Sequence, residues 1–337
     1  MKAAVLYGPG DVRIEDVEIP ELGINDVLIK VMACGVCGTD YALFKGDYPG
    51  NYPVIIGHEF AGQVIRIGSE VTKFKPGDRV TVDPNTVCHK CFYCQSGSEH
   101  LCSDLKSMGV HQHGAVAEYC KIGESNIYKI PDNLLYTEAA FTEPLACAIH
   151  GNDIAQVKIG DTVLIIGAGG MGNLITQVAK YSGAANIIVS EPIEHRRELA
   201  LENGATHVVD PNSEDIESEI RKLSKVGADV VFEVAGNNST QALSVSLSKK
   251  GGTIVFFGCS PQNNMIEINP FLLNENEIKI SGSFNNKFAT ARAVQMLSSG
   301  VIRVDNLISH NFQLKDYLTV FNKFGASDTM KLMVLFE

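Results

Sequence analysis

Four cysteines stand close together in one polar stretch of the sequence. They are separated by two, two and seven residues, and they are Cys88, Cys91, Cys94 and Cys102. Four thiolates at such spacing can complete a tetrahedral zinc site that leaves no coordination position open. Two disulfides or four unrelated buried thiols are the alternatives, and such dense spacing argues against both. We therefore predict a structural zinc site. The neighbouring His89 and His100 could replace one of the cysteine ligands but are not needed.

A second set of metal-ligand side chains is scattered along the first 145 residues. Each lies beside turn-forming residues, in the segments Cys37-Gly38-Thr39-Asp40, Gly57-His58-Glu59 and Thr142-Glu143-Pro144. Each segment alone is weak evidence for a metal site, because a lone histidine is more often structural and Glu59 could be a solvated charge. Cys34 and Cys37 form a C-x2-C pair, but the strand–helix context of a thioredoxin-like redox site is missing. These residues suggest an open metal site only when taken together.

A glycine-rich turn joins an apolar strand to a helix in the second half of the chain. The strand is expected at 162–166, and the turn is Gly167-Ala168-Gly169-Gly170-Met171-Gly172. Glycines allow the tight turn and let the backbone approach a pyrophosphate at the positive end of the helix. A lone G-x-G-x-x-G is weak evidence, but this strand–turn–helix context supports a dinucleotide site.

Glu191 ends the next expected strand, nineteen residues after Gly172. A carboxylate there can accept hydrogen bonds from the ribose hydroxyls of NAD and repel the 2′-phosphate of NADP. Arg196 and Arg197 follow closely and weaken this discrimination, and an exposed strand-end charge is the alternative. We predict NAD as the cofactor in preference to NADP.

The elements that must position these residues differ between two parts of the chain. Up to about residue 140 the expected strands are short and broken by turns, as at 27–31, 62–67 and 79–82. From about 155, apolar strands alternate with helices, as at 162–166, 185–190 and 194–203. This alternation indicates a parallel sheet covered on both faces. After about 285 only one helix, 290–299, and mixed polar segments are expected.

Composition excludes several classes of protein. With 45% hydrophobic and 20% charged residues, the chain can bury enough apolar surface to be globular rather than disordered. A net charge of −11 excludes a general nucleic-acid binder. Residues 1–10 lack the apolar core of a signal peptide, and no stretch approaches the ~18 apolar residues of a membrane helix. Nine cysteines, an odd number, fit a cytoplasmic protein with reduced thiols.

In combination and order, the motifs resemble the zinc-dependent medium-chain alcohol and polyol dehydrogenases over essentially the whole chain. The resemblance implies that Cys37 and His58 are ligands of a catalytic zinc. Glu143 takes the third position, which is a cysteine in ordinary alcohol dehydrogenases, and its Glu-Pro-Leu setting is similar to the sorbitol and polyol branch. Cys147 is the alternative third ligand, and Glu59 is expected in or just outside the ligand shell.

The implied reaction is the reversible oxidation of a secondary alcohol to a ketone, with hydride transfer to NAD. Thr39 is placed to pass the proton away, and Asp40 to accept a hydrogen bond from the second ring nitrogen of His58. Zinc with Cys37, His58 and Glu143 has a formal charge of zero. Because another permanent carboxylate would oppose an alkoxide, we expect Glu59 to bind zinc only when substrate or water leaves.

Two positions depart from the family pattern. Ala42 stands where many relatives have a histidine that relays the proton to solvent. Asn285 and Asn286 follow Phe284 where sorbitol dehydrogenases have an Arg-Tyr pair. This argues against sorbitol itself and leaves another polyol, a diol, or an aminated or phosphorylated relative open.

The resemblance also implies the architecture and partners. A β-rich GroES-like catalytic domain would comprise 1–142 and 286–337, and a Rossmann NAD-binding domain 143–285. We expect an α/β fold with two zinc ions per chain, a small-molecule alcohol or ketone substrate, and a homo-oligomer, dimer or tetramer. The rivals are a zinc-loop binding or redox-sensing protein without catalysis, and a zinc-independent enone reductase of the same superfamily.

Overall fold

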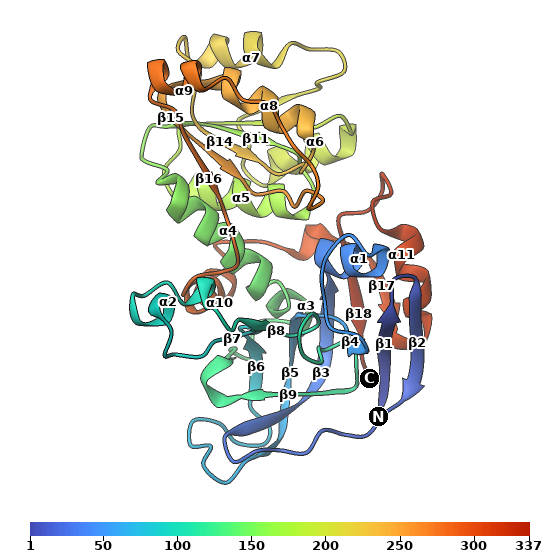
Figure 1. Cartoon of the computed structure of the whole chain (residues 1–337). Helices are drawn as coiled ribbons and strands as arrows, with labels where there is room; N and C mark the ends of the chain where they lie inside the picture. Colours follow the sequence, from blue (N-terminus) through green and yellow to red (C-terminus); the bar gives the residue numbers. More distant parts are fainter. The chain divides into compact units, whose positions relative to one another are not determined.

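The computed structural model describes residues 1–337 and divides the chain into two compact units (Figure 1). Unit 1 comprises 1–146 and 286–337, and unit 2 comprises 147–285. One unit is therefore inserted into the sequence of the other. No helix has both the length and the apolar character needed to cross a bilayer.

Unit 1 is built on a seven-stranded sheet in the order β10-β6-β5-β3-β18-β17, with β9 also paired to β3, and a smaller sheet β2-β1-β4. Its strands are β1 (Lys2–Gly8), β2 (Asp11–Asp16), β3 (Asp26–Val36), β4 (Val54–Ile55), β5 (Glu59–Ile67), β6 (Arg79–Val82), β7 (Asn85–Thr86), β8 (Lys106–Ser107), β9 (Tyr119–Gly123), β10 (Ile127–Lys129), β17 (Ile308–Gln313) and β18 (Lys331–Leu335). Its helices are α1 (Gly38–Lys45), α2 (Phe92–Gln95), α3 (Tyr136–Ala139), α10 (Thr290–Ser298) and α11 (Val320–Lys323), and α4 (Thr142–Ala155) continues into unit 2. Buried β-branched and aromatic residues from both ends of the chain fill one core, among them Ile29, Phe60, Tyr317 and Val334.

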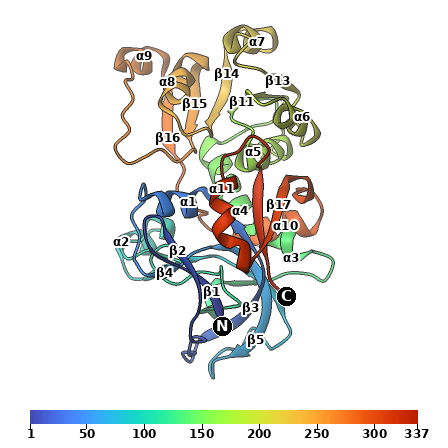
Figure 2. The same ribbon diagram turned by 90° about the vertical axis from the view of Figure 1, so that its right-hand side faces the viewer.

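The C-terminal segment supplies part of this sheet (Figure 2). β18 pairs antiparallel with β3, and β17 pairs parallel with β18. The expectation of mixed polar segments after residue 299 was therefore wrong for residues 331–335, which are nearly all buried. Their apolar side chains pack into the core against β3, which explains why this short run forms a strand.

Unit 2 has a six-stranded parallel sheet in the order β13-β12-β11-β14-β15-β16. The strands are β11 (Thr162–Ile166), β12 (Asn186–Ser190), β13 (His207–Val209), β14 (Ala228–Glu233), β15 (Ser248–Phe256) and β16 (Lys279–Gly282), and the helices are α5 (Gly170–Tyr181), α6 (Glu194–Glu202), α7 (Ile216–Leu223), α8 (Asn238–Leu247) and α9 (Pro270–Asn276). In sheet position the strands follow 3-2-1-4-5-6, the order of dinucleotide-binding folds. All five side chains of β11 are buried, as expected for a strand covered on both faces. The predicted doubly wound parallel sheet is confirmed.

Candidate zinc and dinucleotide sites

The four cysteines of the first motif converge on one point. The Cys91 sulfur lies 3.6 Å from that of Cys94 and 3.9 Å from that of Cys102, and all four thiols are free. Backbone amides of Cys88 and Asp104 donate to the Cys102 sulfur at 3.3 and 3.4 Å. Hydrogen bonds from backbone groups lower the pKa of Cys91 to about 6, which favours the thiolate that binds metal. The donor set therefore fits a closed zinc site made of four thiolates.

Replacing Cys91 by Ser should remove one zinc ion per chain and leave a second one bound. The segment 85–107 has only short elements, namely β7, β8, α2 and a 3₁₀ turn at Glu99–Leu101, so we expect its order to depend on the metal rather than on a core of its own. Metal analysis and limited proteolysis check this, with Cys120→Ala as a control, because Cys120 is buried in β9 outside the cluster. Unchanged zinc content in Cys91→Ser would contradict the assignment.

A second group of ligand atoms is formed by Cys37, His58 and Glu59, which lie within 4.8 Å of one another. Cys37 directly precedes α1, and Glu59 begins β5 immediately after His58. Gly57 turns the chain there with a positive φ of 92°, and a Cβ on it would lie 2.5 Å from Val116. The structure therefore brings together three of the four residues predicted around a catalytic zinc.

Asp40 joins the two segments that carry these ligands. It is fully buried, accepts a hydrogen bond from the Cys37 amide at 2.9 Å, and accepts one from the Gly57 amide at 3.2 Å. Its carboxylate lies 3.6 Å from Nδ1 of His58, longer than a hydrogen bond. Burial lowers the pKa of His58, but Asp40 and Cys37 outweigh it and raise that pKa well above its usual value. A metal at this histidine would displace the proton.

Thr39 lies on α1, and Glu143 lies on α4. The Thr39 hydroxyl oxygen is 3.7 Å from the Cys37 sulfur. Glu143 is buried on the first turn of α4, outside the set of atoms that lie within 4.8 Å of one another. Cys147 follows one turn later on the same helix and is half-buried.

Lys331 is a site residue that no sequence motif indicated. At the start of β18, its ammonium donates to both oxygens of Glu59, at 2.8 and 2.6 Å, although the two residues are 272 positions apart. Burial lowers the pKa of Lys331, but the charges of Glu59, Cys37 and Glu143 outweigh burial and raise it. The only signal in the sequence was one lysine at the start of an apolar run, Lys331-Leu-Met-Val-Leu335.

In unit 2 the predicted glycine turn links β11 to α5. Gly167 has a positive φ of 104°, and a Cβ on Gly172 would lie 2.0 Å from the Gly167 carbonyl oxygen, so both positions require glycine. α5 begins at Gly170, with Gly169 just before it and Met171 in its first turn. The backbone amides of this first turn make the positive end at which a diphosphate can bind.

Glu191 is buried and holds the glycine turn. Its carboxylate accepts hydrogen bonds from the amides of Ala168, at 2.8 Å, and Ile193, at 3.1 Å. Arg197 donates to the Glu191 carbonyl oxygen and lies 3.5 Å from Asp210. Arg196 is half-buried near the start of α6.

Two buried polar residues were missed, one that supports this turn and one at the end of the neighbouring strand β14. Asn173 is fully buried and donates to the carbonyl oxygens of Ala168 and Gly169 at 2.8 and 3.2 Å. Glu233 ends β14 next to Ile166, is fully buried, and accepts from the Gly236 amide at 2.9 Å; burial raises its pKa. The only signal for either in the sequence was a polar residue within or at the end of a mainly apolar run.

Two family models match this chain: the alcohol dehydrogenase GroES-like domain over residues 23–132, and the zinc-binding dehydrogenase over 170–299. The chain is 35% identical to the sorbitol dehydrogenase of Bacillus subtilis (strain 168) over 321 residues, 94% of this chain and 91% of that one. It is 33% identical to the D-arabitol-phosphate dehydrogenase of Enterococcus avium over 342 residues, 99% and 97% of the two chains.

A solved structure from Sinorhizobium meliloti 1021, described as a zinc-binding dehydrogenase bound to NADP, matches with a TM-score of 0.96 at 40% identity. The match covers 99% of this chain and 98% of that chain. The chain therefore belongs to the zinc-dependent medium-chain alcohol and polyol dehydrogenases. It is an oxidoreductase with a GroES-like and a Rossmann-like domain, and neither the non-catalytic zinc-loop protein nor the enone reductase is favoured.

Proposed function

We propose that this enzyme interconverts a secondary alcohol of a polyol, a diol or a related sugar alcohol with its ketone, using NAD. The observation that supports this most is the convergence of the ligand atoms of Cys37, His58 and Glu59, which lie within 4.8 Å of one another. The buried Asp40 accepts hydrogen bonds from the amides of Cys37 and Gly57 beside them. In the proposal Cys37, His58 and Glu143 hold the catalytic metal, and the four cysteines of the loop hold a structural one. A bound zinc supplies Lewis acidity to a substrate hydroxyl, and a bound nicotinamide accepts the hydride.

The charges of the proposed ligands suit this chemistry. One thiolate, one neutral imidazole and one carboxylate balance the two positive charges of zinc, and they leave a coordination position for a hydroxyl. Glu59, as a fourth permanent protein ligand, would fill that position and add a negative charge. We therefore propose that Glu59 coordinates the metal only when substrate or water has left.

Replacing Thr39 by Ala should lower turnover by about 100-fold, the lower end of the usual contribution of a positioned proton-transfer group. In the proposal its hydroxyl, 3.7 Å from the Cys37 sulfur, receives the proton of the substrate hydroxyl and passes it on. Steady-state kinetics checks this, with zinc content and NAD affinity expected to be unchanged. Thr39→Ser keeps the hydroxyl and should retain most of the activity. Equal turnover in Thr39→Ala and the unmodified enzyme would remove Thr39 from the mechanism.

The proposal of NAD over NADP depends on Glu191. Its buried carboxylate supports it, because a negative charge at the end of β12 opposes a 2′-phosphate. Two observations favour NADP instead: the positive charge of Arg196, and the NADP bound to the Sinorhizobium meliloti relative. The test is to measure kcat/KM for NAD and for NADP with the same substrate. A higher kcat/KM for NADP would overturn the proposal.

The substrate class is tested with a panel of polyols, diols, amino alcohols and sugar-alcohol phosphates. The named relatives act on sorbitol and on D-arabitol phosphate, so both free and phosphorylated sugar alcohols belong in the panel. Asn285 and Asn286 replace the Arg-Tyr pair of sorbitol dehydrogenases, and we expect a compound other than sorbitol to give the highest kcat/KM. If the enzyme carries both zinc ions and oxidises none of these compounds, the proposed function is wrong.

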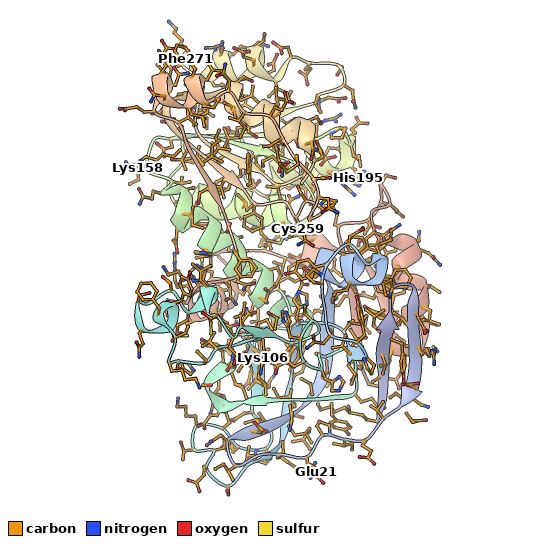
Figure 3. All side chains as sticks on the ribbon, in the orientation of Figure 1. Glu21, Lys106, Lys158, His195, Cys259 and Phe271 are labelled. Atoms are coloured by element: carbon orange, nitrogen blue, oxygen red, sulfur yellow. The ribbon has the colours of Figure 1, made fainter.

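We also propose that units 1 and 2 act as the catalytic and the NAD-binding domain, and that the enzyme is a cytoplasmic homo-oligomer. Nine cysteines, an odd number, support a reducing compartment. The edge strand β16 and the exposed Phe271 on α9 (Figure 3) support contact between copies. Light scattering tests the oligomer, and a monomer at micromolar concentration would contradict it.

A further inference from the structure

The carboxylate of Glu59 is held by an ion pair that unit 1 builds from the two ends of the chain. Lys331 donates to both of its oxygens at 2.8 and 2.6 Å and to the Val36 carbonyl oxygen at 3.4 Å. The exposed fractions of the two side chains are 9% for Lys331 and 2% for Glu59. A contact so well shielded from water is little screened by salt and fixes both side chains.

The same carboxylate is also seated against a glycine. Gly35 in β3 lies opposite Glu59 in β5, and a Cβ on Gly35 would lie 2.3 Å from a Glu59 oxygen. The ring of Phe141 covers the other partner, with its centre 5.9 Å from the Lys331 ammonium nitrogen. The carboxylate thus occupies the space that a side chain at Gly35 would fill, and Lys331 keeps it there.

Glu59 is at the same time a member of the metal-ligand group. One of its oxygens lies within 4.8 Å of the Cys37 sulfur and of a His58 ring nitrogen. Two cations can therefore attract one carboxylate, the ammonium of Lys331 and a metal held by Cys37 and His58. Without Lys331, the metal would be the nearest cation to a buried and otherwise unpaired carboxylate.

We propose that Lys331 is a positioning residue that holds Glu59 against Gly35 and so keeps one coordination position of the catalytic zinc open for the substrate. This inference rests on the proposed zinc site and deepens it. In this inference, the ion pair with Lys331 is the reason that Glu59 coordinates the metal only temporarily.

The test uses the full-length enzyme with Co²⁺ in the catalytic site and imidazole as an added metal ligand. In Lys331→Met, the freed carboxylate should compete with imidazole at a high effective concentration and lower its affinity at least about tenfold. The visible absorption of the cobalt should change at the same time. Lys331→Arg keeps the charge and should resemble the unmodified enzyme.

A double variant distinguishes positioning from a general loss of structure. Lys331→Met/Glu59→Gln lacks the competing carboxylate and should recover the imidazole affinity of the unmodified enzyme. Unchanged imidazole affinity and an unchanged spectrum in Lys331→Met, or a loss that persists in the double variant, would overturn the inference.

Gly35→Ala gives an independent test if Lys331→Met does not fold. Its methyl group occupies the space of the Glu59 carboxylate while Lys331 stays in place. The displaced carboxylate should then compete for the metal, so imidazole affinity should fall as well. Unaltered affinity in Gly35→Ala would overturn the inference. Neither measurement uses an alcohol substrate. A failure of the proposed function, seen as no oxidation of any alcohol in the panel, is therefore distinguishable from a failure of this inference.

Discussion

Replacing Cys37 by Ser should lower turnover at least about 10,000-fold and remove one of the two zinc ions. Cys37 supplies the only thiolate among the three residues whose ligand atoms lie within 4.8 Å of one another. A serine hydroxyl is a poor zinc ligand at neutral pH, so the metal and its Lewis acidity are lost together. That acidity is worth several kcal/mol, and each 1.36 kcal/mol is about a factor of ten in rate. Steady-state kinetics and metal analysis on the same sample check this.

Cys34→Ala is the matched control, because Cys34 is the other cysteine of the C-x2-C pair and is fully buried in β3. It is outside the ligand group, so its removal should leave both zinc ions bound and change turnover less than about tenfold. Comparable losses in Cys34→Ala and Cys37→Ser would instead favour a redox pair and contradict the zinc site.

The second large effect is expected from Gly172→Ala in unit 2. The new methyl group would lie 2.0 Å from the Gly167 carbonyl oxygen and 3.0 Å from its carbon, so α5 or the turn must move. If two backbone hydrogen bonds to the diphosphate are lost, each worth about 1–1.5 kcal/mol, the affinity for the proposed dinucleotide falls about 30- to 150-fold. The same clash should lower the melting temperature by several degrees, as overpacking against backbone usually does.

Gly169→Ala separates the two effects. No atom lies within 4 Å of a Cβ built on Gly169, and its φ of −66° is accessible to alanine. The protein without cofactor should therefore keep its melting temperature, while the methyl group blocks the close approach of a diphosphate. Calorimetry for affinity and thermal unfolding for stability check both variants. Equal melting temperatures for Gly172→Ala and the unmodified protein would show that the turn tolerates the side chain.

Residues close together in sequence could be predicted as a site from their spacing, whereas partners far apart could be predicted only where the family resemblance indicated them. The spacing of Cys88, Cys91, Cys94 and Cys102 leaves few alternatives, and the structure brings their sulfurs together. Lys331 escaped prediction because its place depends on the register of three strands, β18 on β3 and β3 on β5. A side chain 272 residues away has no local pattern that points to Glu59.

The same reasoning applies to the fold. Apolar runs such as 162–166 are strands in the structure because each residue is buried by a sheet with helices on both faces. The strand at 308–313 pairs with the strand at 331–335, which in turn pairs with β3. Only the family resemblance indicated that the C-terminal segment returns to the first domain. The approach of Asp40 to both Cys37 and Gly57 also depends on tertiary structure, since no local pattern joins the two segments.

The most direct test of a zinc-dependent polyol dehydrogenase is to measure cofactor reduction and zinc content together during removal of the metal. The enzyme, with the alcohol from the panel that gives the highest rate, is dialysed against a chelator and then resupplied with Zn²⁺. We predict two zinc ions per chain at the start, activity that falls in proportion to loss of the first ion, and recovery when it returns. Full activity after loss of that zinc would contradict the account, as would no activity toward any alcohol with both ions bound.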